Sequence, residues 1–304
     1  MPTTRLAPSP TGALHLGNAR TFLLNWLLAR QRGWRMVLRI EDLDGPRIKR
    51  GADREAIEDL KWLGIDWDEG PIYQSSRKAK YAAAIDHLVK RGAAYPCVCS
   101  RSEVNQAASA PHAEDANTIY PGTCRGRFKS LEEAQKVSGW PAVLRFAVPD
   151  GAVEFKDRFK GVQRFNVASQ LGDFVIAKAD GTPAYQLAVV VDDADMNMTE
   201  VVRGDDLIDS TPRQILLYEA LGWSKQIPNY YHLPLIVGAD GRRLAKRHGD
   251  TRLAYYRERG VAASRVLELL KCWSGMSGSE FDLEQLPRQP IIFSEEDNRF
   301  LLGK

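Results

Sequence analysis

The stretch Thr3-Thr-Arg-Leu-Ala-Pro-Ser-Pro-Thr-Gly-Ala-Leu-His-Leu-Gly-Asn18 decides the fold that we predict for this chain of 304 residues. It combines a short strand, a loop rich in Pro, and the start of a helix. Such a unit builds a parallel sheet whose ligand site lies at the carboxyl ends of the strands, so we expect an α/β protein. The predicted order is strand 3–7, loop 8–12, helix 15–32 ending near Gly33, and strand 34–40.

Short apolar runs continue to alternate with helical patterns further along the chain, which favours a Rossmann-like, doubly wound parallel sheet. The continuous apolar run 185–191 is predicted to be a buried strand. Asp192, Asp193 and Asp195 follow it, and we expect them to be solvated or to cap a helix. The predicted helices are 53–63 with Asp53 as N-cap, 77–91, 130–137 with a capping box of Ser130 and Glu133, and one opened by Thr211-Pro212 that ends at Leu221.

Residues 95–179 interrupt this alternation with cysteines and with Pro and Gly punctuation. We therefore predict an inserted α+β domain there, between two halves of a catalytic-type sheet domain at 1–94 and 180–254. The remaining residues, 255–304, form a short helical segment in this prediction. The chain is long enough to bury a sizeable core in about two domains.

The charge of the chain is uneven although the net charge is only +3. Residues 1–50 and 242–271 each hold nine Lys or Arg against three acids, whereas 189–209 holds one against seven. The basic stretches are either ordinary solvated surface or a surface that faces a polyanion. The N-terminus lacks a signal-peptide pattern and no run approaches the roughly 18 apolar residues of a membrane span, so we expect a soluble cytoplasmic protein.

His15 and Gly17 stand where the first strand passes into the first helix. Backbone N–H groups at a helix start have no partner within the helix and face anions, and His15 can donate to phosphate oxygens. Gly17 lets a flat base approach the backbone. Taken alone, His15 is as well explained as a structural or solvated residue, and Gly17 as a turn former.

Five segments in a fixed order resemble the class I glutamyl- and glutaminyl-tRNA synthetases, over roughly residues 3–250. Residues 8–18 resemble the HIGH motif of that family. The other four are Arg39-Ile-Glu-Asp-Leu-Asp44, Arg203-Gly-Asp-Asp-Leu207, Ser210-Thr-Pro-Arg-Gln214 and His232-Leu-Pro-Leu-Ile236. The resemblance implies a Rossmann-like core that joins an amino acid to AMP.

The resemblance also implies an ATP site. Arg243-Leu-Ala-Lys-Arg247 falls where the family carries its KMSKS-type loop, although Ala245 and Arg247 depart from that motif. In isolation this pentapeptide is better explained as a solvated basic turn after Gly238, and its position after the other motifs reverses that preference. The implied catalytic residues are His15 and Lys246, with Mg²⁺ accompanying ATP, and the implied ATP-binding residues are His15, Gly17, Asn18, Arg243 and Lys246.

A glutamate pocket follows from the same resemblance, because a cation must face the side-chain carboxylate if glutamine is to be rejected. Arg5 would meet the γ-carboxylate, Glu41 the α-amino group, and Tyr185 and Arg203 would complete the recognition. Each residue also has an ordinary structural explanation. The positions that match the family's pocket are Arg5, Ala7, Ser9, Glu41, Tyr185 and Arg203.

Cys97, Cys99, Tyr120 and Cys124 offer three thiolates and a phenol, enough for one structural Zn²⁺. Tyrosine is an unusual ligand because its phenol ionises near pH 10. Many glutamyl-tRNA synthetases place a His two residues after the last Cys, where this chain has Gly126. The fourth ligand is therefore Tyr120, His112 or water, and three merely buried cysteines are the alternative.

The chain ends at Lys304, without the anticodon-reading domain of full-length members, and so most resembles the short branch of the family. That branch activates L-glutamate and attaches it to queuosine at the wobble position of tRNA(Asp). The expected partners are thus ATP, L-glutamate and tRNA(Asp) bearing queuosine, with the protein a monomer. The alternatives are a truncated enzyme that charges the 3′ end of tRNA(Glu), a HIGH-bearing nucleotidylyltransferase, and a non-catalytic tRNA-binding protein.

Overall fold

The computed structural model describes residues 1–43, 45–100, 102–104, 119–242, 244, 250–276 and 281–303. Its longer helices are α1 (Leu16–Arg32), α2 (Ala52–Trp62), α3 (Lys78–Lys90), α5 (Leu131–Ser138), α7 (Tyr185–Asp195), α8 (Ser210–Ala220), α10 (Ala263–Cys272) and α11 (Glu295–Leu302), with α6 (Val167–Gln170) and α9 (Leu253–Glu258) shorter. Its strands are β1 (Thr3–Leu6), β2 (Arg35–Ile40), β3 (Glu69–Tyr73), β4 (Ala94–Cys97), β5 (Val143–Phe146), β6 (Val153–Asp157), β7 (Gly161–Phe165), β8 (Phe174–Ala177), β9 (Glu200–Gly204), β10 (Asn229–Leu233), β11 (Ile236–Val237) and β12 (Ile291–Ile292).

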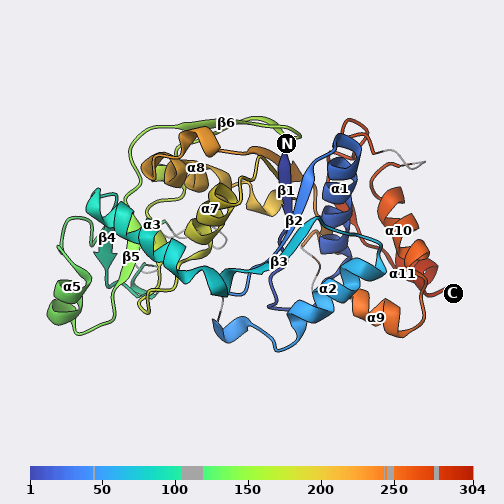
Figure 1. Ribbon diagram of the computed structural model, residues 1–304, viewed down its shortest axis with the longest axis horizontal. Coiled ribbons are helices and arrows are strands. Elements are labelled where there is room, and N and C mark those ends of the chain that lie inside the picture. The colour runs from blue at the N-terminus through green and yellow to red at the C-terminus, as the bar shows by residue number, and fades with distance from the viewer. Residues whose placement is uncertain are drawn as a thin grey trace.

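A parallel sheet forms the centre of the molecule. β2 pairs with β1 on one side and β3 on the other, and both pairings are parallel. The parallel pair β9–β10 lies on the other side of β1, because Thr199 donates its backbone N–H to the carbonyl oxygen of Thr3 at 2.9 Å. Figure 1 shows β1 to β3 side by side, with α1 and α2 on one side of them and α7 and α8 on the other. The structure therefore confirms the predicted α/β class and the predicted strand–helix–strand opening.

Helix α1 is held at both ends by the residues that predicted its limits. His15 is the N-cap, and Gly33 ends the helix in a left-handed conformation with φ of 64°. Its leucines pack into the larger core with β1, β2 and α10, where each fully buried leucine contributes about 1.5–3 kcal/mol. The buried Arg20 donates to the carbonyl of Pro234 at 2.8 Å and to Ser274 Oγ at 3.0 Å, which attaches α1 to the C-terminal segment.

The structure contradicts the prediction of a strand at 185–191. These residues belong to α7, which packs between α3 and α8 in the second core. Its valines are buried all around, so their pattern lacks the polar stripe of an amphipathic helix and cannot be distinguished from a buried strand. Asp53 was also wrong as the N-cap of α2, since Gly51 occupies that position and Asp53 lies in the first turn.

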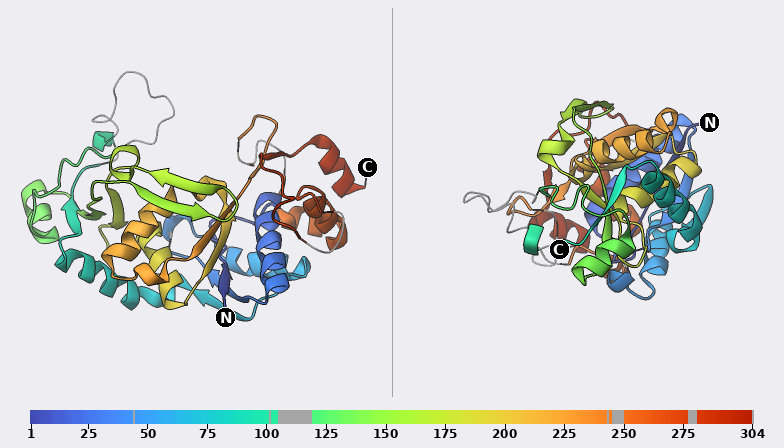
Figure 2. Two further views of the ribbon diagram at one scale, coloured as in Figure 1. Left: turned by 90° about the horizontal axis from the view of Figure 1, so that it is seen from above. Right: turned by 90° about the vertical axis from the view of Figure 1, so that its left-hand side faces the viewer.

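The second half of the molecule carries an antiparallel sheet in the order β4-β5-β8 and the hairpin β6–β7. α5 begins at Ser130, whose side chain accepts from the N–H of Glu133 as predicted. The Glu133 carboxylate instead accepts from the N–H of Lys129, so the reciprocal half of the capping box is not formed. α5 lies at one end of the long axis and α11 at the other, and Figure 2 shows the β6–β7 hairpin running between the two halves.

Candidate active site

A cavity of about 670 Å³ opens at the carboxyl ends of β1 and β9, beside the start of α1. Glu41, directly after β2, and Tyr185, the first residue of α7, reach it from either side. The fold thus brings together segments that are far apart in the sequence. Nine predicted site residues line this cavity: Arg5, Ala7, Ser9, His15, Gly17, Asn18, Glu41, Tyr185 and Arg203.

The start of α1 is organised by His15. Its Nδ1 accepts the backbone N–H of Gly17 at 3.1 Å, and Asn18 Oδ1 accepts the N–H of His15 at 3.3 Å. Because Nδ1 is an acceptor, the proton of a neutral imidazole lies on Nε2, the nitrogen that can donate to a ligand. A Cβ on Gly17 would lie 3.0 Å from His15 Cε1, so a side chain at this position would displace the capping imidazole.

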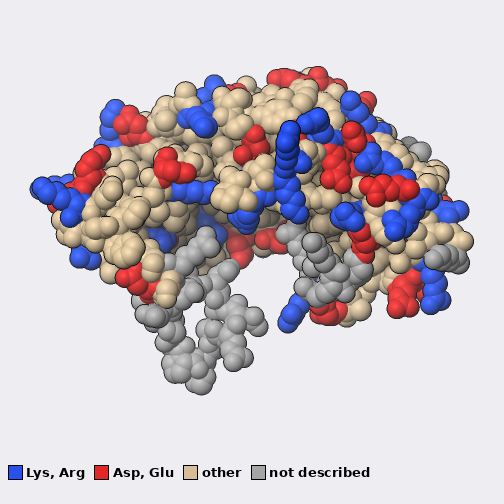
Figure 3. Space-filling view, turned by 90° about the horizontal axis from the view of Figure 1, so that it is seen from below, with Lys and Arg blue, Asp and Glu red and all other residues tan. Residues whose placement is uncertain are grey.

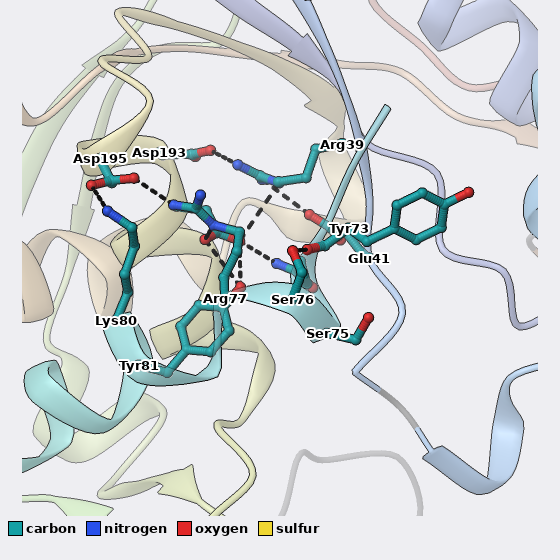
Figure 4. A network of polar contacts seen from close by, with 12 residues as sticks. Arg39, Glu41, Tyr73, Ser75, Ser76, Arg77, Lys80, Tyr81, Asp193 and Asp195 are labelled. Atoms are coloured by element: carbon teal, nitrogen blue, oxygen red, sulfur yellow. Dashed lines mark hydrogen bonds and ion pairs between the residues drawn. The ribbon is translucent and has the colours of Figure 1, made fainter. Parts of the chain in front are cut away.

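A network of buried charges supports Glu41 from behind. Arg39 is fully buried, and its Nη2 donates to Glu41 Oε1 at 3.0 Å while its Nη1 donates to Asp193 Oδ1 at 2.5 Å. Arg5 Nε lies 3.4 Å from the same oxygen of Asp193. Figure 4 shows Arg39 between Glu41 and Asp193. The orientation of Glu41 is therefore set by an arginine that has no access to solvent.

Asp192 and Asp195 extend this network to α3. Arg77 Nε donates to Asp192 at 2.7 Å. Lys80 Nζ donates to Asp195 at 2.5 Å, as Figure 4 shows. All three aspartates are thus paired at the end of a helix, and the predicted solvated or capping role was wrong for the buried Asp192 and Asp193, whereas Asp195 is exposed. A charged residue within an otherwise apolar strand, such as Arg39, was the sequence signal for a buried partner.

Two carboxyl groups of the network respond to it in opposite ways. Burial raises the pKa of Glu41 above its ordinary value, although Arg39 and Arg5 oppose this rise. Burial also disfavours ionisation of Asp193, but Arg39 and Arg5 together lower its pKa below the ordinary value. The arginines thus favour the ionised form of Asp193, whereas burial disfavours the ionised form of Glu41.

These buried ion pairs also change how the basic and acidic stretches of the sequence are interpreted. Arg5 and Arg39 from the basic stretch 1–50 are buried, and Asp192 and Asp193 from the acidic stretch 189–209 are buried against them. These charges therefore neutralise one another inside the protein instead of forming opposed surfaces. Figure 3 shows basic and acidic side chains interspersed on one face, which is hollowed between its two halves.

A second cavity of about 760 Å³ adjoins the first, since Gly12, Ala13 and His15 line both. Lys49 and Arg50, both exposed, border it, as do Leu244 and residues 250–252. The backbone N–H of Leu16 donates to the carbonyl of Thr251 at 3.0 Å, and that of Leu253 to Leu14 at 2.9 Å. The segment after residue 249 is thereby fixed beside the start of α1.

Cys97, Cys99 and Cys124 converge in a separate site near β4, with their sulfur atoms within 4.8 Å of one another. The phenol oxygen of Tyr120 lies 3.3 Å from Cys97 Sγ and 3.6 Å from Cys99 Sγ. Tetrahedral Zn²⁺ with bonds of about 2.3 Å requires sulfur atoms roughly 3.8 Å apart. The observed Cys99–Cys124 separation of 3.5 Å is close to this value, so the four donor atoms fit one metal ion.

A family model described as "tRNA synthetases class I (E and Q), catalytic domain" matches residues 2–285. The chain belongs to this class I glutamyl- and glutaminyl-tRNA synthetase family. One relative, the glutamyl-Q tRNA(Asp) synthetase of Symbiobacterium thermophilum, is 47% identical over 98% of each chain. The glutamate–tRNA ligase of Geotalea uraniireducens is 41% identical over 96% of this chain, which spans only 63% of that longer protein.

Solved structures of the same synthetase family share the fold. A glutamate tRNA ligase from Elizabethkingia meningosepticum, crystallised with its amino acid, superposes with a TM-score of 0.81 at 30% identity. The match covers 99% of this chain and 68% of that one. The family membership confirms an ATP-dependent aminoacyl-tRNA synthetase, a ligase, and the Rossmann-like α/β core predicted for it.

Some predicted residues of this synthetase cannot be placed in the site, and some residues of the site were not predicted. Arg243, Lys246 and His112 lie outside the described residues. The residues that sequence reasoning did not assign to the site are Arg39 and Asp193, which hold Arg5 and Glu41, together with Asp157 and His232 behind Arg203. In the described part of the chain, no helix combines the length and apolar character needed to span a membrane.

Proposed function

We propose that the protein activates L-glutamate with ATP and transfers the glutamyl group to the queuosine base at the wobble position of tRNA(Asp). The observation that carries this proposal is the convergence of nine family positions on one cavity, in a chain whose similar-length relative is a glutamyl-Q tRNA(Asp) synthetase. The glutamate–tRNA ligases it also matches are longer.

Glutamate fits the charge around the cavity. The residues that line it include three arginines and two acids, so one positive charge is in excess; they are Arg5, Arg47, Arg203, Glu41 and Asp206. Glutamate carries two carboxylates and one ammonium group and therefore has one net negative charge. Arg5 would hold the γ-carboxylate, Glu41 the α-ammonium group, and Tyr185 and Arg203 would complete the site, with Ala7 and Ser9 beside them. Glutamine would leave the arginines without a counter-charge.

Adenylate formation requires an anionic carboxylate to attack the α-phosphate of ATP, and the repulsion between them must be offset. His15, Gly17 and Asn18 at the start of α1 would hold ATP, with Mg²⁺ adding charge neutralisation on the phosphates. Lys246 and Arg243 would contribute from the segment whose flanking residues line the second cavity. Pyrophosphate then leaves, and a nucleotide hydroxyl displaces AMP from the glutamyl adenylate.

The thiol site and the division of the chain complete the proposal. Cys97, Cys99, Tyr120 and Cys124 would bind one structural Zn²⁺, which would fasten β4 to the segment around Tyr120. The catalytic domain would comprise 1–94 and 180–254, the zinc-bearing inserted domain 95–179, and the helical segment 255–304. We also propose a cytoplasmic monomer.

Mapping the position of the glutamyl group tests the acceptor. Labelled glutamate, ATP and the protein are incubated with tRNA from cells that make queuosine and from cells that do not. We expect label only in the first sample and only in the fragment of tRNA(Asp) that contains the anticodon. The same tRNA without its 3′-terminal adenosine should accept glutamate equally well. Label on the terminal adenosine of tRNA(Glu) would favour the longer relatives' reaction instead.

A further inference from the structure

A line of buried hydrogen bonds runs behind Arg203. Its Nε donates to Nε2 of His232 at 3.0 Å, and Nδ1 of His232 lies 2.7 Å from Oδ2 of Asp157. The exposed fractions of the three residues are 5%, 0% and 1%, so water does not compete for these bonds. Arg203 from β9, His232 from β10 and Asp157 from the end of β6 therefore form one chain of hydrogen bonds, which we call the relay.

The direction of each bond follows from the donors present. An arginine at neutral pH only donates, so Nε2 of His232 accepts and its proton lies on Nδ1, facing Asp157. Burial lowers the pKa of His232 despite Asp157, which keeps the imidazole neutral. Asp157 also accepts the backbone N–H groups of Phe159 at 2.9 Å and Lys160 at 2.7 Å, which holds its carboxylate in place.

A second bond completes the fixation of the guanidinium group. Nη2 of Arg203 donates to Thr211 Oγ1 at 2.8 Å, and the guanidinium lies over the ring of Tyr230. Within the described residues, Nη1 is the guanidinium nitrogen left without a hydrogen-bond acceptor although it is buried. Arg203 also lines the cavity, so the relay and Thr211 together fix the place of its guanidinium group in the cavity wall.

We propose that Asp157 and His232 are positioning residues that fix the Arg203 guanidinium in the cavity wall, where it recognises a carboxylate of the amino-acid substrate. This inference rests on the proposed function and deepens it, since it assigns part of glutamate recognition to residues that do not line the cavity. The relay also links the β6–β7 hairpin to the amino-acid pocket. The binding of glutamate, and not the binding of ATP, then depends on Asp157.

Steady-state pyrophosphate exchange tests the relay. In Asp157→Asn and His232→Phe, we expect the KM for glutamate to rise about ten- to a hundredfold, the range for losing a buried hydrogen bond to a charged group. The KM for ATP and kcat should stay within about threefold of the wild-type values. The variants lose an interaction that binds glutamate equally strongly before and in the transition state, so only the KM for glutamate rises. The control is Asp173→Asn, which changes another buried aspartate, bonded to Tyr95 and Arg125, that does not line either cavity.

Conservative variants separate positioning from general damage. His232→Gln retains an acceptor for Arg203 and should recover part of the affinity lost in His232→Phe. Thr211→Val should raise the glutamate KM, whereas Thr211→Ser, which keeps the hydroxyl, should leave it near the wild-type value. If the wild type exchanges pyrophosphate with glutamate but the variants keep its KM, the relay is refuted. The same holds if the KM values of glutamate and ATP rise together. A wild type whose exchange ignores glutamate refutes the proposed function itself.

Discussion

Tyr120 shows how a single side chain can determine the chemistry of the proposed metal site. Its phenol oxygen accepts the backbone N–H of Cys124 at 2.8 Å and lies within 3.6 Å of two cysteine sulfurs. The guanidinium of Arg145 lies 3.8 Å from the centre of the phenol ring and also donates to Cys97 Sγ. Three thiolates and a phenolate around Zn²⁺ would carry two net negative charges, and Arg145 compensates one of them.

Removing the phenol oxygen should therefore weaken zinc binding without removing the fold. We expect Tyr120→Phe to bind Zn²⁺ about ten- to a hundredfold more weakly than the wild type, measured by competition with a chromophoric chelator. Cys124→Ser should lose more affinity. Tyr95→Phe is the matched control, since Tyr95 is equally buried but bonds Asp173 instead of the cluster. If Tyr120→Phe binds Zn²⁺ as tightly as the wild type, the fourth ligand is water or His112 and not Tyr120.

At the scale of elements, α1 and α7 show what a sequence can and cannot predict. α1 was predicted to within one residue because His15 caps its start with its side chain and Gly33 ends it in a left-handed conformation that few other residues adopt. α7 was predicted as a strand because its run Leu187–Val191 is apolar on every side. Only the packing of α3 and α8 around it, which involves residues distant in sequence, makes a helix the better solution. Local signals therefore predict capped, half-exposed helices better than fully buried ones.

The contact between α2 and α9 contains a carboxyl that is poorly compensated. Asp59 on α2 is fully buried, and neither of its oxygens has a hydrogen-bond donor within the described residues. Its nearest cation is Arg257 on α9, whose Nη2 lies 3.3 Å away, while Nη1 pairs with the exposed Glu58. Burial consequently raises the pKa of Asp59 to about 7. The α2–α9 contact thus favours the protonated acid.

This shift predicts a pH dependence of stability with a defined sign. The raised pKa contributes stability to the folded protein. This contribution is fully present below pH 3.8, the pKa of the unfolded state, and is lost as the pH rises through 7. Between pH 5 and pH 8 the wild type should therefore lose stability relative to Asp59→Asn. The difference between their free energies of unfolding should change by about 1–2 kcal/mol in favour of the variant, after allowance for solvent screening.

Urea unfolding at the two pH values measures this gain. Glu58→Gln is the control, because it removes the same charge from the same helix and the same arginine, but at an exposed position. Its difference from the wild type should not change with pH. Parallel pH profiles for Asp59→Asn and the wild type would show that Asp59 is already ionised at pH 5.

At the scale of the whole molecule, the fold divides the charges of the chain into those that build the pocket and those that remain outside. The family positions could be predicted from the motifs, because each motif holds its residues locally. Their supports could not, because Asp193 meets Arg39, and Asp157 meets His232, only after distant segments pack together. Arg5 and Arg39 of the basic stretch 1–50 pair with buried aspartates in this way. Lys49 and Arg50 stay exposed beside the second cavity.

Exposed basic residues next to the active cavity should contact the phosphates of tRNA. We expect the double variant Lys49→Ala/Arg50→Ala to raise the KM for tRNA at least tenfold while glutamate-dependent pyrophosphate exchange changes less than about threefold. The slope of log KM for tRNA against log salt concentration should fall by roughly 1.5, because the variant makes two fewer phosphate contacts and its binding releases fewer counterions. Lys90→Ala/Arg91→Ala removes equal charge from exposed positions that line neither cavity and should change neither quantity. If the exchange reaction fails before tRNA binding does, these two residues serve ATP instead, because the second cavity also includes His15.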